Sequence, residues 1–145
     1  MKLAAKTLVL GFALVAGAAI AAEATDPTVR ERQVLMDTIG MNTGILGKMA
    51  GGETPFDAAA AEAAKAALVA AATEIPAKFE PQATDPKSTS KPEIWTNWED
   101  YLAKANALKT AAEAVDATTL EGVQAGMGAI GGTCRDCHST YRTPS

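Results

Sequence analysis

The pentapeptide Cys134-Arg135-Asp136-Cys137-His138 limits the fold more than any other part of the sequence. Cys-x-x-Cys-His is the attachment signature of a c-type haem. On a helix, the two cysteines lie one turn apart on one face, and the histidine lies beside them. The thiols can then form thioethers with the vinyl groups on one porphyrin edge, while the imidazole binds iron. The motif therefore predicts one covalently attached haem c, with His138 as the proximal iron ligand.

Other interpretations explain the motif less well. A thioredoxin-like Cys-x-x-Cys belongs to a βαβ unit, whereas the residues before Cys134 have a helical pattern. A structural zinc site needs four ligands, and the chain contains two Cys and one His in total. A disulfide between Cys134 and Cys137 is the remaining alternative, and it leaves His138 without a role.

Residues 1–22 have the pattern of a secretory signal peptide. Lys2 and Lys6 precede an uncharged run that ends in small residues, and cleavage is expected after Ala21 or Ala22. The run is shorter than the roughly 20 apolar residues that a membrane span needs, and no later stretch is long enough. We therefore expect a periplasmic domain of residues 23–145 without stable membrane insertion. Export agrees with the motif, because c-type haem is joined to its thiols on the exported side of the membrane.

The charge of the mature chain argues against nucleic acid as a partner. Without Lys2 and Lys6, the 13 basic residues of the whole chain fall to 11, against 17 acidic residues, which gives a net charge of −6. No basic patch of the kind that binds nucleic acid is present. The core is rich in alanine and poor in aromatic residues, so a haem between helices would supply much of the missing apolar volume. The composition thus favours a fold that is coupled to its cofactor.

Four helical segments follow one another along the mature chain. The first runs from about residue 28 to 50, with Asp26 or Thr28 as its N-cap and Gly51-Gly52 after its end. The second covers residues 57 to about 75, where alanine dominates, and we expect Pro76 to end it. The apolar stripe of the first helix consists of Leu35, Ile39, Leu46 and Met49.

The second half of the chain repeats this pairing of helices. Pro92 opens a third helix that reaches about Val115, and a fourth begins near Thr118 or Thr119 and continues through the haem motif to about Arg142. Residues 77–91 between the two halves are expected to form a structureless loop. Short turns within each half make the paired helices antiparallel neighbours. The sequence therefore predicts an all-α, up-down-up-down four-helix bundle with a haem near the C-terminus.

Four methionines of the mature chain are candidates for the iron ligand opposite His138. Met127 precedes the motif on the same helix, so it belongs to the wrong side of the iron. On the first helix, Met41 and Met49 each lie about 140° around the axis from Met36, at about 100° per residue. Met36 borders the apolar stripe and can face the core. Two interpretations stay open for Met36, namely an iron ligand and a flexible side chain that fills the core.

Several motifs together resemble the class II c-type cytochromes, the group of cytochromes c′ and c-556. The chain shares with them the ending from Thr133 to Arg142, in which Cys-x-x-Cys-His is followed by x-x-Tyr-Arg. The Arg-x-x-x-Met of residues 32–36, the Gly-Glu-x-Pro-Phe-Asp of residues 52–57 and the Pro-x-Ile-Trp of residues 92–95 resemble further parts of the family pattern. The resemblance covers essentially the whole mature chain.

This resemblance implies roles for individual residues. Cys134 and Cys137 would bind haem covalently, and His138 would bind iron. Arg32 would lie near the haem propionates, where a guanidinium can pair with carboxylate, and Arg142 would tune the charge around His138. The family divides at the position of Met36. Cytochromes c′ keep a five-coordinate iron that binds NO and CO, whereas c-556 proteins use the methionine as the sixth ligand.

The resulting hypothesis is a periplasmic one-electron carrier with a single low-spin haem and His138 and Met36 as axial ligands. Its partners would be redox proteins. The alternative is a high-spin cytochrome c′ that binds NO or CO, and the resemblance also leaves a homodimer through the first two helices open. An enzymatic role is not expected, because the chain has no second His and no obvious acid–base pair for cleaving a peroxide bond.

Overall fold

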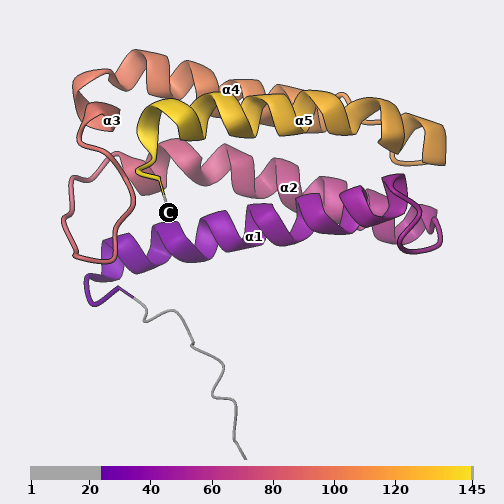
Figure 1. The fold of residues 1–145 in the computed structure, drawn as a ribbon, viewed down its shortest axis with the longest axis horizontal. Coiled ribbons are helices and arrows are strands. Elements are labelled where there is room, and N and C mark those ends of the chain that lie inside the picture. The colour runs from indigo at the N-terminus through magenta and orange to yellow at the C-terminus, as the bar shows by residue number, and fades with distance from the viewer. Residues whose placement is uncertain (1–23, 145) are drawn as a thin grey trace, which may run out of the picture.

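Four long helices dominate the computed structural model, which describes residues 24–144. The predicted signal peptide, residues 1–22, lies outside the described residues. The long helices are α1 (Pro27–Ala50), α2 (Ala58–Phe79), α4 (Trp98–Glu113) and α5 (Leu120–Tyr141), and the single turn α3 (Glu93–Thr96) precedes α4. Both α1 and α4 pack against α2 and α5, and successive long helices run in opposite directions (Figure 1). The predicted antiparallel four-helix bundle is confirmed.

Side-chain caps explain where α1 and α5 begin. The carboxylate of Asp26 accepts a hydrogen bond from the Val29 amide at 3.0 Å, and Pro27 occupies the first turn of α1. Thr119 caps α5 in the same way through the Gly122 amide, also at 3.0 Å. After α1, Gly52 has a φ of +75°, a left-handed conformation that costs glycine little. The predicted starts of the first and fourth helices and the end of the first are thereby confirmed.

The core follows the predicted stripes. All four stripe residues of α1 (Leu35, Ile39, Leu46 and Met49) are buried. In the second half of the chain, the buried residues include Ile94, Ala105, Leu108, Val123 and Ile130. Alanines fill most of the buried face of α2, with Leu68 as its largest fully buried side chain. The interior is therefore built mainly from small aliphatic groups.

Two helix boundaries differ from expectation. Pro76 does not end α2, which continues to Phe79. A proline near the end of a helix removes only one backbone hydrogen bond, and this last turn is held in place because Phe79 is buried and its carbonyl accepts a bond from the Trp95 indole at 2.8 Å. The expected third helix is interrupted at Asn97, where φ is −120° and ψ is 43°. The break lets Trp95 reach the end of α2 while Tyr101 of α4 turns into the core.

The loop expected between the two halves is irregular from residue 80 on, as predicted, but it is not structureless. Residues 85–91, which we call the strap, contain no helix, yet hydrogen bonds hold them at both ends. Asp85 is buried and accepts bonds from the amides of Thr25, Asp26 and Lys87 at 2.8, 2.9 and 2.8 Å. Toward its other end, the strap pairs with the residues that follow α5. Figure 1 shows this segment crossing the end of the bundle where α1 begins.

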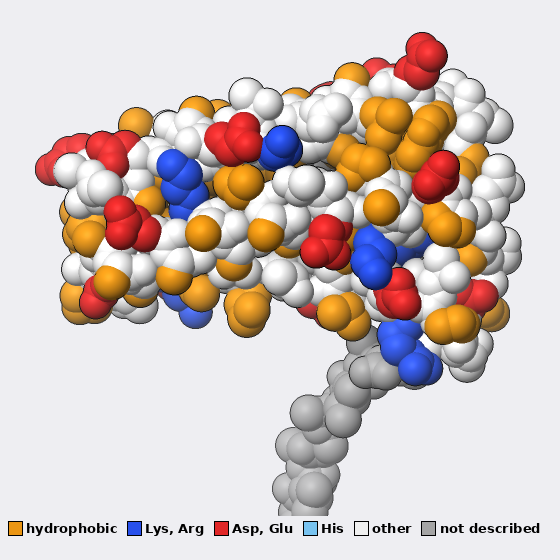
Figure 2. Space-filling view, turned by 180° about the vertical axis from the view of Figure 1, so that it is seen from behind, with side chains coloured by type: hydrophobic (Ala, Val, Ile, Leu, Met, Phe, Trp, Pro, Cys, Tyr) orange, Lys and Arg blue, Asp and Glu red, His pale blue; other side chains and the backbone are white. Residues whose placement is uncertain are grey.

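The surface of the described residues is mixed in character. No helix within residues 24–144 is long and apolar enough to cross a membrane. Figure 2 shows acidic and basic side chains scattered over the rear face, with apolar side chains gathered toward the end that carries α3. Large exposed apolar residues occur on α1, where Val34, Met41 and Ile45 are exposed.

Two glycines of α5 give a matched test of packing. A Cβ at Gly126 would lie 2.6 Å from a methyl group of Val115, whereas a Cβ at Gly128 would meet nothing within 4 Å. Gly126→Ala should lower the free energy of unfolding by about 1–3 kcal/mol through overpacking. Gly128→Ala should raise it by about 0.5–1 kcal/mol, because glycine in a helix costs backbone entropy. Guanidinium denaturation of both variants measures the difference. Equal stabilities would contradict the close contact between Gly126 and Val115.

Candidate functional site

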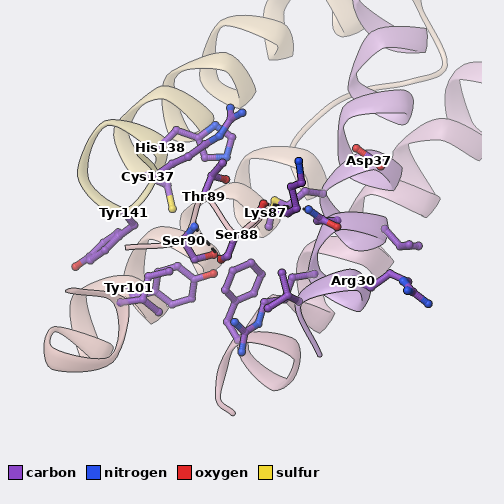
Figure 3. Close-up of a pocket in the computed structure, with 18 residues that line it drawn as sticks. Arg30, Asp37, Lys87, Ser88, Thr89, Ser90, Tyr101, Cys137, His138 and Tyr141 are labelled. Carbon is purple, nitrogen blue, oxygen red and sulfur yellow. Dashed lines mark hydrogen bonds between the residues drawn. The ribbon is translucent and has the colours of Figure 1, made fainter. Parts of the chain in front are cut away.

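A cavity of about 540 Å³ lies at the end of the bundle where α1 begins and α5 ends. Its walls come from α1, α3, α4 and α5, from the last residue of α2 and from the strap. Figure 3 shows His138, Cys137 and Tyr141 on one side, Arg30 and Asp37 on the other, and strap residues between them. The volume falls within the range of roughly 300–1,000 Å³ that is usual for small-molecule and cofactor sites.

The cavity brings together five of the six predicted site residues. Arg32 and Met36 reach it from α1, Cys137 and His138 reach it from α5, and Arg142 lines it from just beyond α5. Cys134 is not part of the lining. It is half-buried one turn earlier on α5 and packs against the hydrophobic core. Residues about a hundred positions apart in the sequence thus share one site, because α1 and α5 are neighbours in the bundle.

His138 stands in the last turn of α5, where it remains exposed to solvent. Its backbone carbonyl accepts a hydrogen bond from the Arg142 amide at 3.1 Å. Partial burial lowers the pKa of the imidazole, and the positive charge of Arg142 adds to this effect. Both influences favour the neutral imidazole, which is the form that binds a metal.

Both cysteines are free and half-buried in apolar surroundings. Burial raises the pKa of the Cys134 thiol, and it raises the pKa of the Cys137 thiol to about 11. Such an environment disfavours a thiolate, which is the form that binds zinc and attacks disulfides. An uncharged thioether suits the same environment well.

Arg32 is buried beside the cavity, with 3% of its surface exposed. Its Nε donates to the Lys78 carbonyl at 2.9 Å, and its Nη2 donates to the Pro81 carbonyl. The guanidinium lies between two aromatic rings, 5.1 Å from the Phe79 centroid and 5.2 Å from that of Trp95. Its Nη1 is buried and has no hydrogen-bond partner, and burial lowers the pKa of the group. A buried donor of this kind is able to pair with an anionic group in the cavity.

Sequence reasoning did not identify the aromatic wall of the cavity. The ring of Tyr101 is stacked with Trp98 at 5.4 Å, makes an edge contact with Tyr141 at 5.3 Å and lies 5.5 Å from Phe79. The Tyr141 hydroxyl donates to Asp100 at 2.6 Å. Periodicity gave little signal for Tyr101, because the helix break at Asn97 changes which face turns inward. Asp85 was also missed, although Asp-Pro is a turn-forming dipeptide that could have indicated it.

The residues around the cavity fit a haem. Two neutral thiols on one helix face, an imidazole beside them and a methionine on the facing helix form the donor set. The unpartnered Nη1 of Arg32 can pair with a propionate carboxylate. When bound, the haem supplies an iron centre that is able to carry one electron.

The anchoring of Arg32 leads to a stability prediction. Arg32→Met keeps much of the apolar stem but leaves two carbonyls without their charged donor. We expect a loss of about 2–4 kcal/mol, since an unsatisfied buried group costs about 1–3 kcal/mol and the cation–π contacts are lost as well. Guanidinium denaturation measures the loss. Lys48→Met, at an exposed position of α1, is the control, and equal stability of the two variants would contradict the anchoring role.

The environment of Asp85 predicts a pH dependence of stability. Backbone hydrogen bonds from Asp26 and Lys87 lower the pKa of this carboxyl from 3.8 to about 2. Because the folded pKa lies below the unfolded one, the stabilisation is complete above pH 3.8 and is lost as the pH falls from 3.8 toward about 2. Asp85→Asn should therefore have a lower melting temperature than the wild type at pH 6. The difference in melting temperature should be smaller at pH 2.5. An unchanged difference across this window would refute the assignment.

Comparisons with known proteins show what the chain as a whole is similar to. The family model described as cytochrome c′ matches residues 27–142. The cytochrome c-556 of Agrobacterium fabrum is 40% identical over 98% of this chain and 97% of its own length. A solved cytochrome c′ from Rhodobacter sphaeroides superposes with a TM-score of 0.74 at 32% identity, covering 81% of this chain and 96% of that one. A nitric oxide complex of an Alcaligenes xylosoxidans cytochrome c′ variant superposes with a TM-score of 0.72 at 25% identity, over 81% of this chain and 94% of that one.

Proposed function

The chain belongs to the class II c-type cytochromes and carries covalently attached haem c, and from this premise we propose that it is a one-electron carrier of the c-556 type. In this proposal Cys134 and Cys137 hold the haem, His138 is the proximal ligand of the iron and Met36 is the distal one. A ligand pair that stays in place in both oxidation states suits electron transfer. Methionine opposite histidine also raises the reduction potential.

The observation that carries the proposal is that Met36 and His138 line one cavity from two facing helices. Met41 of the same helix is 62% exposed and Met49 is packed in the core, so neither competes with Met36. Met127 is half-buried on α5, and its methyl group lies near Gly47 of α1, away from the cavity lining. Of the four methionines in residues 24–144, Met36 alone lines the cavity with the imidazole.

The surrounding charges fit the same role. Arg32 would donate its unpartnered Nη1 to a propionate, which would also neutralise a buried cation. Arg142, exposed four residues after His138, places a positive charge beside the proximal ligand. The protein's contribution to electron transfer would lie in ligand choice, burial and nearby charge. Partners would be periplasmic redox proteins that meet the exposed edge of the site in brief encounters.

Optical spectra of the purified protein test the proposal directly. Ferric and ferrous spectra are recorded before and after addition of CO. A low-spin spectrum with the far-red sulfur-to-iron band and no response to CO is the expected result. A high-spin spectrum that shifts with CO would overturn the assignment of Met36.

The second candidate is a cytochrome c′ that binds small gases at an open iron position. A relative of this chain forms a complex with nitric oxide, and the same fold and cavity could serve that role here. In that case Met36 would only fill the distal side of the cavity. The response to CO separates the two candidates, because only an open position binds the gas.

A further inference from the structure

The strap forms part of the cavity wall. Lys87, Ser88, Thr89 and Ser90 all line the cavity, and Figure 3 shows them between the α5 side, with His138, and the α1 side, with Arg30. Four consecutive polar residues in irregular structure do not hold such a position by apolar packing. Apart from one bond from the Gln33 amide to the Lys87 carbonyl at 3.3 Å, their placement comes from the hydrogen bonds at the two ends of the strap.

At its beginning, the strap is fixed by one carboxylate. Asp85 is 6% exposed and accepts bonds from the amides of Thr25 and Asp26 and from the hydroxyl of Thr25, at 2.8, 2.9 and 2.9 Å. Its other oxygen accepts from the Lys87 amide at 2.8 Å. Hydrogen bonds to an ionised carboxylate are among the stronger ones in proteins. Asp85 thereby joins the strap to the residues that lead into α1.

At its end, the strap is joined to the segment that follows the haem motif. The Thr143 amide donates to the Thr89 carbonyl at 2.8 Å, and the Lys91 amide donates to the Tyr141 carbonyl at 2.9 Å. Between these two bonds, Ser90 and Arg142 form an antiparallel bridge. The backbone of Arg142 is therefore held by the strap on one side and by the His138 carbonyl on the other.

We propose that Asp85 is a positioning residue for the haem site, which acts by holding the strap in place so that Arg142 stays beside His138. A positive charge held near the proximal ligand favours the reduced, less positive iron. Loss of the hydrogen bonds to Asp85 should therefore lower the reduction potential of the protein. The inference rests on the proposed function, because the haem reports the change, but it does not depend on which group binds the iron opposite His138.

The test uses Asp85→Asn in the haem-loaded protein. Asparagine keeps the side-chain shape and loses the charge, so the backbone donors lose their ionised acceptor. Trypsin reports the strap directly, because cleavage after Lys87 requires the strap to open. We expect this cleavage to be about tenfold faster than in the wild type, since proteolysis follows the population of the open form. We also expect a lower midpoint potential in spectroelectrochemical titration.

Asp116→Asn is the matched control. Asp116 accepts bonds from the amide and hydroxyl of Thr118, at 2.9 and 2.6 Å, in the connection between α4 and α5. Its substitution should change neither cleavage after Lys87 nor the potential. Thr25→Ala removes a single donor to Asp85 and should shift both readouts in the same direction by less, so it carries the test if Asp85→Asn fails to fold.

Each outcome decides a separate point. Unchanged cleavage in Asp85→Asn would refute the claim that Asp85 holds the strap in place. Faster cleavage with an unchanged potential would show that the strap does not influence the haem. This result would refute the role of Asp85 as a positioning residue. A CO-binding, high-spin wild type would overturn the electron-carrier proposal alone, because the cleavage rate and the potential shift remain measurable in that protein.

Discussion

Met36→Leu should convert a low-spin protein that does not bind CO into a high-spin protein that binds it. Leucine fills a similar volume on α1 but offers no lone pair to the iron, so the side chain would still line the cavity without ligating. We expect loss of the far-red sulfur-to-iron band. We also expect a fall in midpoint potential on the order of 100 mV, since the axial ligands of haem proteins set potentials over roughly 0.8 V. Optical titration under controlled potential measures both effects.

The same substitution at Met41 is the matched control. Met41 lies on the same helix, is 62% exposed and does not line the cavity. Met41→Leu should leave the spectrum and the potential unchanged. Identical spectra for Met36→Leu and the wild type would mean that Met36 only packs against the haem, and the gas-binding candidate would then replace the electron carrier.

The double variant Cys134→Ala/Cys137→Ala should lose covalent haem and much of its stability. The core of this bundle is built largely from alanine, and the cavity lined by Met36 and His138 has a volume of about 540 Å³. An unfilled apolar cavity costs about 24 cal/mol per Å³. If the apolar part of this cavity that stays empty amounts to about a quarter of the volume, the cost is about 3 kcal/mol. That corresponds to a melting temperature lower by on the order of 10 °C for a domain of this size.

Calorimetry of the haem-free double variant and of the holoprotein measures this difference. Cys134→Ala alone keeps the second thiol and should retain covalent haem through Cys137, with a smaller loss. Similar melting of the double variant and the holoprotein would refute the coupling of fold and cofactor. It would show that the alanine-rich helices close the cavity without help.

Local patterns in the sequence were sufficient to predict most of the fold. Alanine content and apolar spacing predicted the four long helices, and short polar side chains such as Asp26 and Thr119 marked where two of them begin. The angular position of Met36 on α1 correctly distinguished it from Met41. These inferences rest on interactions within a few residues, where helix geometry is regular.

The features that were missed depend on contacts between distant segments. Pro76 stays inside α2 because Trp95, on another helix, holds the turn that follows it. The strap is ordered because Asp85 finds donors sixty positions earlier in the chain. Neither partner can be inferred from composition near these residues. The polar run at the end of the strap suggested disorder for the same reason, since its hydrogen-bond partners lie beyond α5.

The pairing of the strap with Tyr141 and Thr143 makes closure of the cavity wall depend on the last residues of the chain. A chain that folds in order from its N-terminus would form α1, α2 and α4 before the haem motif is available. The wall of the cavity, however, closes only when the residues after His138 arrive to pair with the strap. In that order the site would stay open until the two cysteines are present. Late closure of this kind would leave the cofactor a period in which it can be attached before the last hydrogen bonds enclose it.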